Sequence, residues 1–87
     1  METTFNILTD QFRPMVLCYL RTLTGDSHLA EDLAQETFLS AYKSIDNFEA
    51  DRDFGAWLRG IARNKYLEHG RSAARKKLLV DLSLIHI

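Results

Sequence analysis

The stretch DFGAWLRGIARNKYLEHGRSAARKK, residues 53–77, predicts one long amphipathic helix that carries many cations. Five apolar side chains recur at three- and four-residue steps and form one helical face: Phe54, Trp57, Leu58, Ile61 and Ala62. Asp51 or Asp53 offers a side-chain cap for the first turn. Gly70 costs about 1 kcal/mol relative to Ala inside a helix, so we expect the helix to fray there.

Two further helices are predicted before this one. Apolar residues at helical spacing run through residues 5–23, and Pro14 should bend that helix or split it in two. Gly25 is a stop signal, and residues 26–27 offer a cap for a second helix over about residues 28–45. No segment alternates in the manner of a strand, so the predicted fold class is all-α, a small bundle of three main helices.

The side chains that the second helix should bury are Leu29, Leu33, Phe38, Ala41, Tyr42 and Ile45. Cys18 lies within the apolar first helix and is interpreted as a small core residue. As the single cysteine it excludes an intramolecular disulfide and a cysteine zinc site, which fits a reducing compartment. No apolar run approaches the roughly 20 residues of a membrane span, and no secretory signal is visible. We therefore expect a small cytoplasmic protein without a cofactor.

The net charge of −1 conceals two oppositely charged parts. Residues 1–51 hold three Lys/Arg against nine Asp/Glu, a net charge of −6. Residues 52–77 hold eight Lys/Arg against two Asp/Glu, a net charge of +6. An acidic segment suits a basic protein surface, and a basic segment suits a polyanion, so the asymmetry indicates what kinds of partner to expect.

The second helix carries an acidic face at three- and four-residue spacing, made of Asp32, Gln35, Glu36 and Leu39. With His28 and Glu31 nearby, its carboxylates allow a metal or acid–base reading, but no second His–carboxylate pair completes such a cluster. An exposed leucine among acids is typical of a protein contact, an apolar anchor in a charged surround. A merely solvated acidic face is the alternative.

On the third helix, Arg59 and Arg63 lie four residues apart, and a solvated helix face explains them when they are taken alone. The acid-free run of residues 71–77 is more suggestive of a polyanion, although a basic run alone is a weak signal. Trp57 is interpreted as core, with an exposed stacking platform as the alternative. Phe48, in the loop DNFEAD, is interpreted as an anchor that holds this loop to the bundle.

Three motifs follow one another along the chain: AEDLAQETFLSAY (30–42), a phenylalanine-containing loop, and WLRGIARN (57–64) with a basic helix end. In this order and at these distances they resemble region 2 of bacterial extracytoplasmic-function sigma factors. Each motif alone is weak, but together they are specific and cover most of the chain. The resemblance implies a non-enzymatic specificity subunit of RNA polymerase that acts in transcription initiation.

The resemblance also implies which residues meet each partner. In such proteins the acidic helix docks on a coiled coil of the polymerase clamp, a role that falls here on Asp32, Gln35, Glu36 and Leu39. The loop and the third helix take the promoter −10 element, melt it and hold an unpaired base of the non-template strand, at the positions of Phe48 and Asn64. The phosphates would face the basic stretch through Arg59, Arg63, Lys65, Arg71 and Arg75. An anti-sigma factor is a further candidate partner.

The chain departs from this family's pattern at several places. Glu68 and Gly70 replace the usual Asp and a larger apolar residue, which leaves base preference and the end of the helix open. The short helix before the first block and the helix-turn-helix domain for the −35 element have no counterpart, so an isolated domain or a truncated protein is expected. Residues 1–77 are taken as the helical domain. Residues 78–87, LLVDLSLIHI, form an apolar tail that packs on the bundle, makes a self-contact or is an artificial extension.

Two other classes of function stay open. One is a stand-alone helical DNA-binding module of the repressor type, and the other is a protein-interaction bundle. A repressor should bind duplex DNA specifically without polymerase, whereas a sigma region should need polymerase or prefer melted promoter DNA. An interaction bundle should bind neither.

Overall fold

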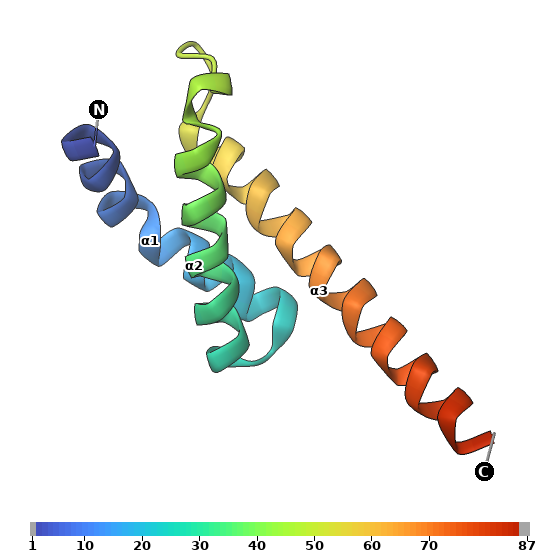
Figure 1. The fold of residues 1–87 in the computed structure, drawn as a ribbon. Helices are drawn as coiled ribbons and strands as arrows, with labels where there is room; N and C mark the ends of the chain where they lie inside the picture. Colours follow the sequence, from blue (N-terminus) through green and yellow to red (C-terminus); the bar gives the residue numbers. More distant parts are fainter. Residues whose placement is uncertain (1, 86–87) are drawn as a thin grey trace.

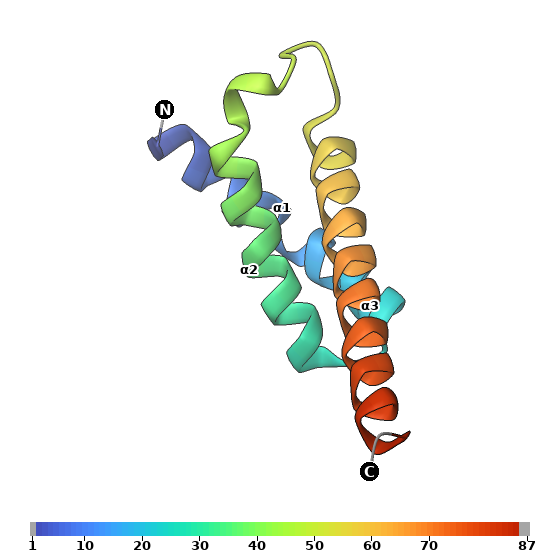
Figure 2. The same ribbon diagram turned by 45° about the vertical axis from the view of Figure 1, so that its right-hand side comes forward.

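The computed structural model describes residues 2–85, with side chains from residue 3 to residue 82. It contains α1 (Glu2–Thr24), α2 (Ser27–Lys43), the 3₁₀ helix η1 (Ile45–Asn47) and α3 (Phe54–Ile85). Helix α1 crosses behind α2, and α3 leaves the bundle as a long rod (Figure 1). A loop joins α2 to α3 at one end of the pair (Figure 2). No strand occurs within residues 2–85, and the predicted all-α bundle of three helices is confirmed.

Local signals set the ends of the helices much as predicted. Gly25 ends α1 with a φ of 66°, a left-handed conformation that glycine adopts without a side-chain clash. The Asp26 carboxylate caps α2 by accepting hydrogen bonds from the backbone N–H groups of His28 and Leu29, at 3.0 and 3.2 Å. Asp53 caps α3, because its Oδ1 accepts from Ala56 N at 3.1 Å.

The core contains apolar side chains from all three helices: Phe5, Val16, Leu20, Ala30, Leu33, Ala34, Phe38, Ala41, Leu58 and Ala62. Helices α1 and α3 approach closely at Gly55, where an added Cβ would lie 3.0 Å from Phe12 Cε1. A side chain at this position would require the Phe12 ring to shift by a few tenths of an ångström. Leu20 of α1 is fully buried at the centre of this core.

Pro14 does not split the first helix, so that alternative was wrong. Helix α1 runs from Glu2 to Thr24 with Pro14 inside it. The fixed φ of proline is compatible with a helix, and the cost lies in one lost hydrogen bond and a clash with the preceding turn. Phe5, before the proline, and Leu20, after it, are buried in the same core, and this packing holds both halves in one helix.

Gly70 does not end the third helix either. Helix α3 continues through it to Ile85, and every described side chain from Leu67 to Leu82 is exposed. Good helix formers surround the glycine and offset its modest cost. The tail residues 78–82 therefore do not pack on the bundle, and residues 86–87 of the predicted tail lie outside the described residues. Within the described part of the chain, no helix is long and apolar enough to cross a membrane.

Two expected core residues are exposed. Cys18 lies two positions from both Val16 and Leu20, which are buried, so helical geometry turns it to the outer face of α1. Tyr42 is 44% exposed because it sits at the edge of the buried face of α2, where its ring and the Phe5 ring pack edge to face with centroids 5.3 Å apart. The expectation of burial was therefore wrong for both residues.

Candidate functional site

The acidic face of α2 lies on the surface, opposite the core face of the same helix. Asp32, Gln35 and Glu36 are exposed, and Leu39 is 60% exposed although it is a large apolar residue. No ion pair among the described side chains involves Asp32 or Glu36. This face therefore presents two carboxylates outside any of these ion pairs, around an apolar side chain, which suits a basic protein surface.

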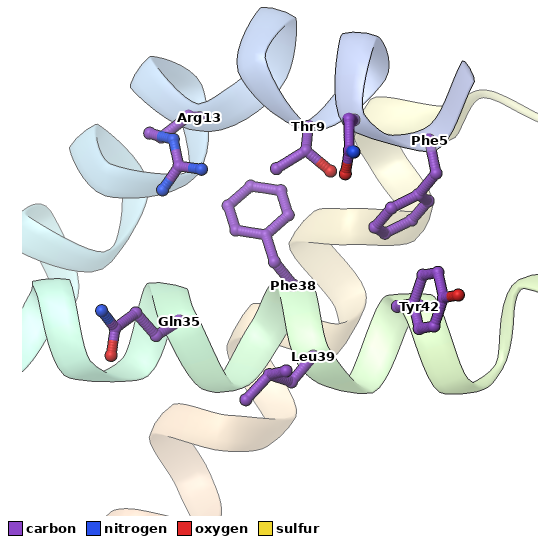
Figure 3. Close-up of a pocket in the computed structure, with 8 residues that line it drawn as sticks. Phe5, Thr9, Arg13, Gln35, Phe38, Leu39 and Tyr42 are labelled. Carbon is purple, nitrogen blue, oxygen red and sulfur yellow. The ribbon is translucent and has the colours of Figure 1, made fainter. Parts of the chain in front are cut away.

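Leu39 forms a ridge between two hollows. Toward α1 lies a groove of about 450 Å³, which we call the α1–α2 groove, and Figure 3 shows its walls. It is lined by Phe5, Asn6, Thr9, Arg13, Gln35, Phe38, Leu39 and Tyr42. Toward α3 lies a smaller hollow of about 160 Å³, lined by Glu36, Leu39, Ser40, Lys43 and Lys65. A partner that covers Leu39 thus meets a raised apolar residue with a depression on each side.

An aromatic cluster joins the loop before α3 to the first turns of that helix. The ring centroid of Phe48 lies 5.3 Å from that of Phe54 and 5.1 Å from that of Trp57. The Phe54 ring also lies 5.5 Å from Phe12 of α1. Phe48 therefore anchors its loop to the bundle, as expected, and Trp57 is half-buried within this cluster.

Asn64 lines a hollow beside this cluster. The hollow, of about 370 Å³, is lined by Ala56, Trp57, Gly60, Ile61, Arg63 and Asn64. Phe48 does not line this hollow, but its ring contacts Trp57, which does, so Trp57 connects the loop to the hollow at Asn64. Sequence spacing alone left the position of the loop relative to Asn64 undetermined.

The cations assigned to phosphates do not share one environment. Arg59, Arg63, Arg71 and Arg75 are exposed, and the last two lie about 10 and about 16 Å beyond Asn64 along the helix axis. Lys65 differs from them because its side chain is only 23% exposed and its Nζ lies 3.5 Å from Glu68 Oε2. It lines two hollows together with Glu36 of α2. Its assignment to phosphate contacts stays a prediction, and its partners favour a smaller contribution than that of the arginines.

The described residues contain no group of three or more His, Cys, Asp or Glu side chains that could hold a metal ion. His28 and Glu31 lie exposed near the start of α2, and His69 lies exposed on α3. The metal interpretation of the acidic helix therefore gains no support from this geometry.

Sequence reasoning missed the contribution of α1 to the surface beside Leu39. Thr9 and Arg13 both line the α1–α2 groove, and the Arg13 guanidinium carbon lies 5.5 Å from the centre of the Phe38 ring. One signal was available in the sequence, because Thr9 and Arg13 continue the i, i+4 row that begins at Phe5. Polar residues at two successive positions of an otherwise apolar row indicate that this part of the helix faces a surface groove and not the hydrophobic core.

Comparison with known proteins identifies the family. The family model for sigma-70 region 2 matches residues 8–76, which include every residue assigned from the sequence to polymerase or DNA and exclude the tail. The chain is 35% identical over 81 residues to a probable RNA polymerase sigma factor of Haemophilus influenzae, which covers 88% of the chain and 42% of that protein. No solved structure gives a significant match.

Two further relatives are extracytoplasmic-function (ECF) proteins. The chain is 44% identical over 70 residues to the ECF RNA polymerase sigma factor BldN of Streptomyces coelicolor, covering 79% of the chain and 26% of that protein. It is 46% identical over 55 residues to the ECF RNA polymerase sigma factor SigW of Bacillus subtilis, covering 63% of the chain and 28% of that protein. The chain thus spans between about a quarter and two fifths of the length of these relatives.

Proposed function

The chain belongs to the sigma-70 region 2 family, among its ECF members, and from this premise we propose that it serves transcription initiation. It binds core RNA polymerase, recognises the promoter −10 element and promotes melting of that element, without catalysing a reaction of its own. This role belongs to the cytoplasm, and residues 1–77 form the domain that carries it. An anti-sigma factor would act by covering one of its two surfaces.

The observation that carries this proposal is the separation of two surfaces of different chemistry. The two hollows beside Leu39 and the hollow beside Asn64 share no residue. The first surface is acidic with an apolar ridge, and the second combines aromatic rings, an amide and nearby arginines. A protein partner at Leu39 and a nucleic acid at Asn64 can therefore be held at the same time, as a sigma factor requires.

The polymerase surface follows from charge and shape. Asp32 and Glu36 attract a basic helical surface such as that of the clamp coiled coil, and Gln35 adds donor and acceptor atoms beside them. Leu39 supplies the apolar contact at the centre, where truncation usually costs most. Acids on α2 also repel DNA, which keeps the nucleic acid on the side of α3.

The nucleic-acid surface divides its tasks among different side chains. Arg59, Arg63, Arg71 and Arg75 neutralise phosphates, which provides affinity without sequence preference. An unpaired base costs a few kcal/mol to extract from its stack, and the pocket must recover that cost through apolar contact and hydrogen bonds. Trp57 offers the contact and is held in place by Phe48, and the Asn64 amide offers both a donor and an acceptor.

Capture of bacterial core RNA polymerase by the immobilised 87-residue chain tests the proposal. We expect core to be retained, and duplex −10 DNA without polymerase to bind weakly, with a Kd of about 10⁻⁴ to 10⁻⁶ M that rises steeply with salt. Submicromolar, sequence-specific duplex binding without polymerase would support the repressor alternative. Binding of neither core nor DNA would support the interaction bundle.

Asn64→Ala tests the base pocket. The wild type should lose affinity for a single-stranded non-template −10 oligonucleotide when one particular position is abasic, by a factor of about 5 to 100. The variant should bind the intact and the abasic oligonucleotide equally, because neither the amide donor nor the acceptor is present. Fluorescence anisotropy with an abasic substitution at each position measures this.

Asn6→Ala is the matched control, since Asn6 is an exposed asparagine on α1 that does not line the hollow beside Asn64. It should keep the wild-type pattern of abasic sensitivity. Equal sensitivity of Asn64→Ala and wild type at that position would place the base pocket elsewhere.

A further inference from the structure

The α1–α2 groove is built from two kinds of wall. Phe5, Phe38, Leu39 and Tyr42 provide apolar surface. Arg13 of α1 and Gln35 of α2 provide polar groups at one end, and Thr9 lies between Arg13 and Phe5 on the α1 wall (Figure 3). Gln35 and Leu39 belong both to this groove and to the acidic face of α2. The groove is therefore a continuation of the surface assigned to the polymerase.

Thr9 is an unusual component of this groove. Its side chain is buried, with 8% exposure, and its Oγ1 has no hydrogen-bond partner among the described residues. The other buried threonine behaves differently, because Thr37 Oγ1 donates to Leu33 O at 2.7 Å. A buried hydroxyl without a partner is costly, and an apolar residue of the same shape would avoid that cost. Its presence in a groove wall points to a partner atom that arrives from outside.

Arg13 places a cation at the same side of the groove. Its guanidinium lies over the Phe38 ring, and its ion pair with Asp10 is long, at 3.9 Å, with a largely exposed carboxylate. Such an exposed pair contributes little, so the guanidinium can exchange Asp10 for a better acceptor. Arg13 and Thr9 are both hydrogen-bond donors, four residues apart on α1, and they lie next to apolar surface.

We infer that the α1–α2 groove receives one long side chain from the polymerase segment that covers Leu39, an inference that rests on the proposed function. This side chain has an apolar stem and ends in a carboxylate or amide oxygen, as glutamate and glutamine do. The stem packs against Phe38 and Leu39, and the terminal oxygen accepts hydrogen bonds from Thr9 Oγ1 and Arg13.

Charge complementarity favours this occupant over a wholly basic segment. The acids of α2 select basic residues on one side of Leu39, whereas Arg13 selects an acceptor on the other side. A polymerase helix that carries cations along one face and a single glutamate or glutamine beside them satisfies both requirements. A reversed orientation of that helix places cations against Arg13 and is disfavoured, so the groove also sets the direction of docking.

Two pairs of variants test the inference by their Kd for core RNA polymerase, with a dye on Cys18, which is exposed and does not line the groove. Thr9→Val removes the hydroxyl and should raise Kd about fivefold or more, while the melting temperature stays equal or rises. Thr37→Val is its control and should leave Kd unchanged. Arg13→Met should raise Kd about tenfold. Arg21→Met, which removes an exposed cation of α1 outside the groove, should not.

A cross-linking experiment identifies the occupant. A photoreactive p-benzoylphenylalanine at Asn6 should cross-link to a polymerase helix that contains basic residues and a glutamate or glutamine, and the same group at Gln11, outside the groove, should not. Failure of the wild-type chain to bind core would refute the proposed function itself. Normal binding by Thr9→Val and Arg13→Met, or cross-links from Asn6 to another protein only, would refute this inference while the proposed function stands.

Discussion

Leu58→Ala is expected to lower the free energy of unfolding by about 2 to 5 kcal/mol. Leu58 has 0% exposure and lies in the core that α1, α2 and α3 share. Its truncation removes apolar contacts and leaves a cavity that a bundle of three helices cannot close without shifting one of them. Urea unfolding followed by circular dichroism measures the change. A domain of this size has little stability in reserve, so the variant should be partly unfolded near physiological temperature.

Leu67→Ala is the matched control on the same helix. Leu67 is 40% exposed and is not part of the shared core, so the same substitution should cost much less, about 0.5 kcal/mol. Similar losses for Leu58→Ala and Leu67→Ala would contradict the position of the core described above.

Leu39→Ala is expected to weaken binding to core RNA polymerase by about 2 kcal/mol or more, equivalent to roughly 30-fold in Kd. Leu39 is the apolar ridge between the two hollows of α2, where a partner excludes water most completely. The free domain should keep its stability because the side chain is 60% exposed. Titration of labelled chain with core polymerase measures the affinity, and Gln35→Ala should show a loss in the same direction.

Ile7→Ala is the control for this variant, since Ile7 is 62% exposed on α1 and lines none of the hollows beside Leu39. It should bind core polymerase as the wild type does. If alanine at Asp32, Gln35, Glu36 and Leu39 leaves the affinity unchanged in every case, the polymerase surface is not on this face of α2.

The helices themselves could be predicted because their signals are local. Gly25, Asp26 and Asp53 act through backbone groups within three residues of their own positions, so sequence alone identifies them. The apolar face of α3 was predicted for the same reason, since Leu58 and Ala62 recur at helical spacing. The effects of Pro14 and Gly70 were overestimated from these local signals. Packing of both halves of α1 on the core outweighed the cost of Pro14, a few kcal/mol, and neighbouring helix formers outweighed the smaller cost of Gly70.

The same distinction applies to the candidate surfaces: those on a single helix could be predicted from the sequence, and those formed between two elements could not. The acidic face of α2 could be predicted because its four residues lie on one helix, and the exposure of Leu39 follows from the same periodicity. The α1–α2 groove could not be predicted. It depends on how α1 and α2 cross, and the sequence does not specify the direction in which the turn between them leads the chain. The contact of Phe48 with Trp57 also depended on the path of a loop, which spacing does not specify.

The length of α3 has a consequence for how the domain approaches its partners. The molecule measures 55 Å along its longest axis, and the cations of residues 71–77 lie on the part of α3 that projects from the acidic bundle (Figure 1). Such an arrangement is a permanent electric dipole, and near a polyanion it experiences a torque that turns the positive end forward. Ions screen the field beyond about 8 Å at physiological salt, so this rotation occurs within the last nanometre of approach. Under the proposed function, we expect the domain to reach the nucleic acid already oriented, which shortens the rotational search that limits most association rates.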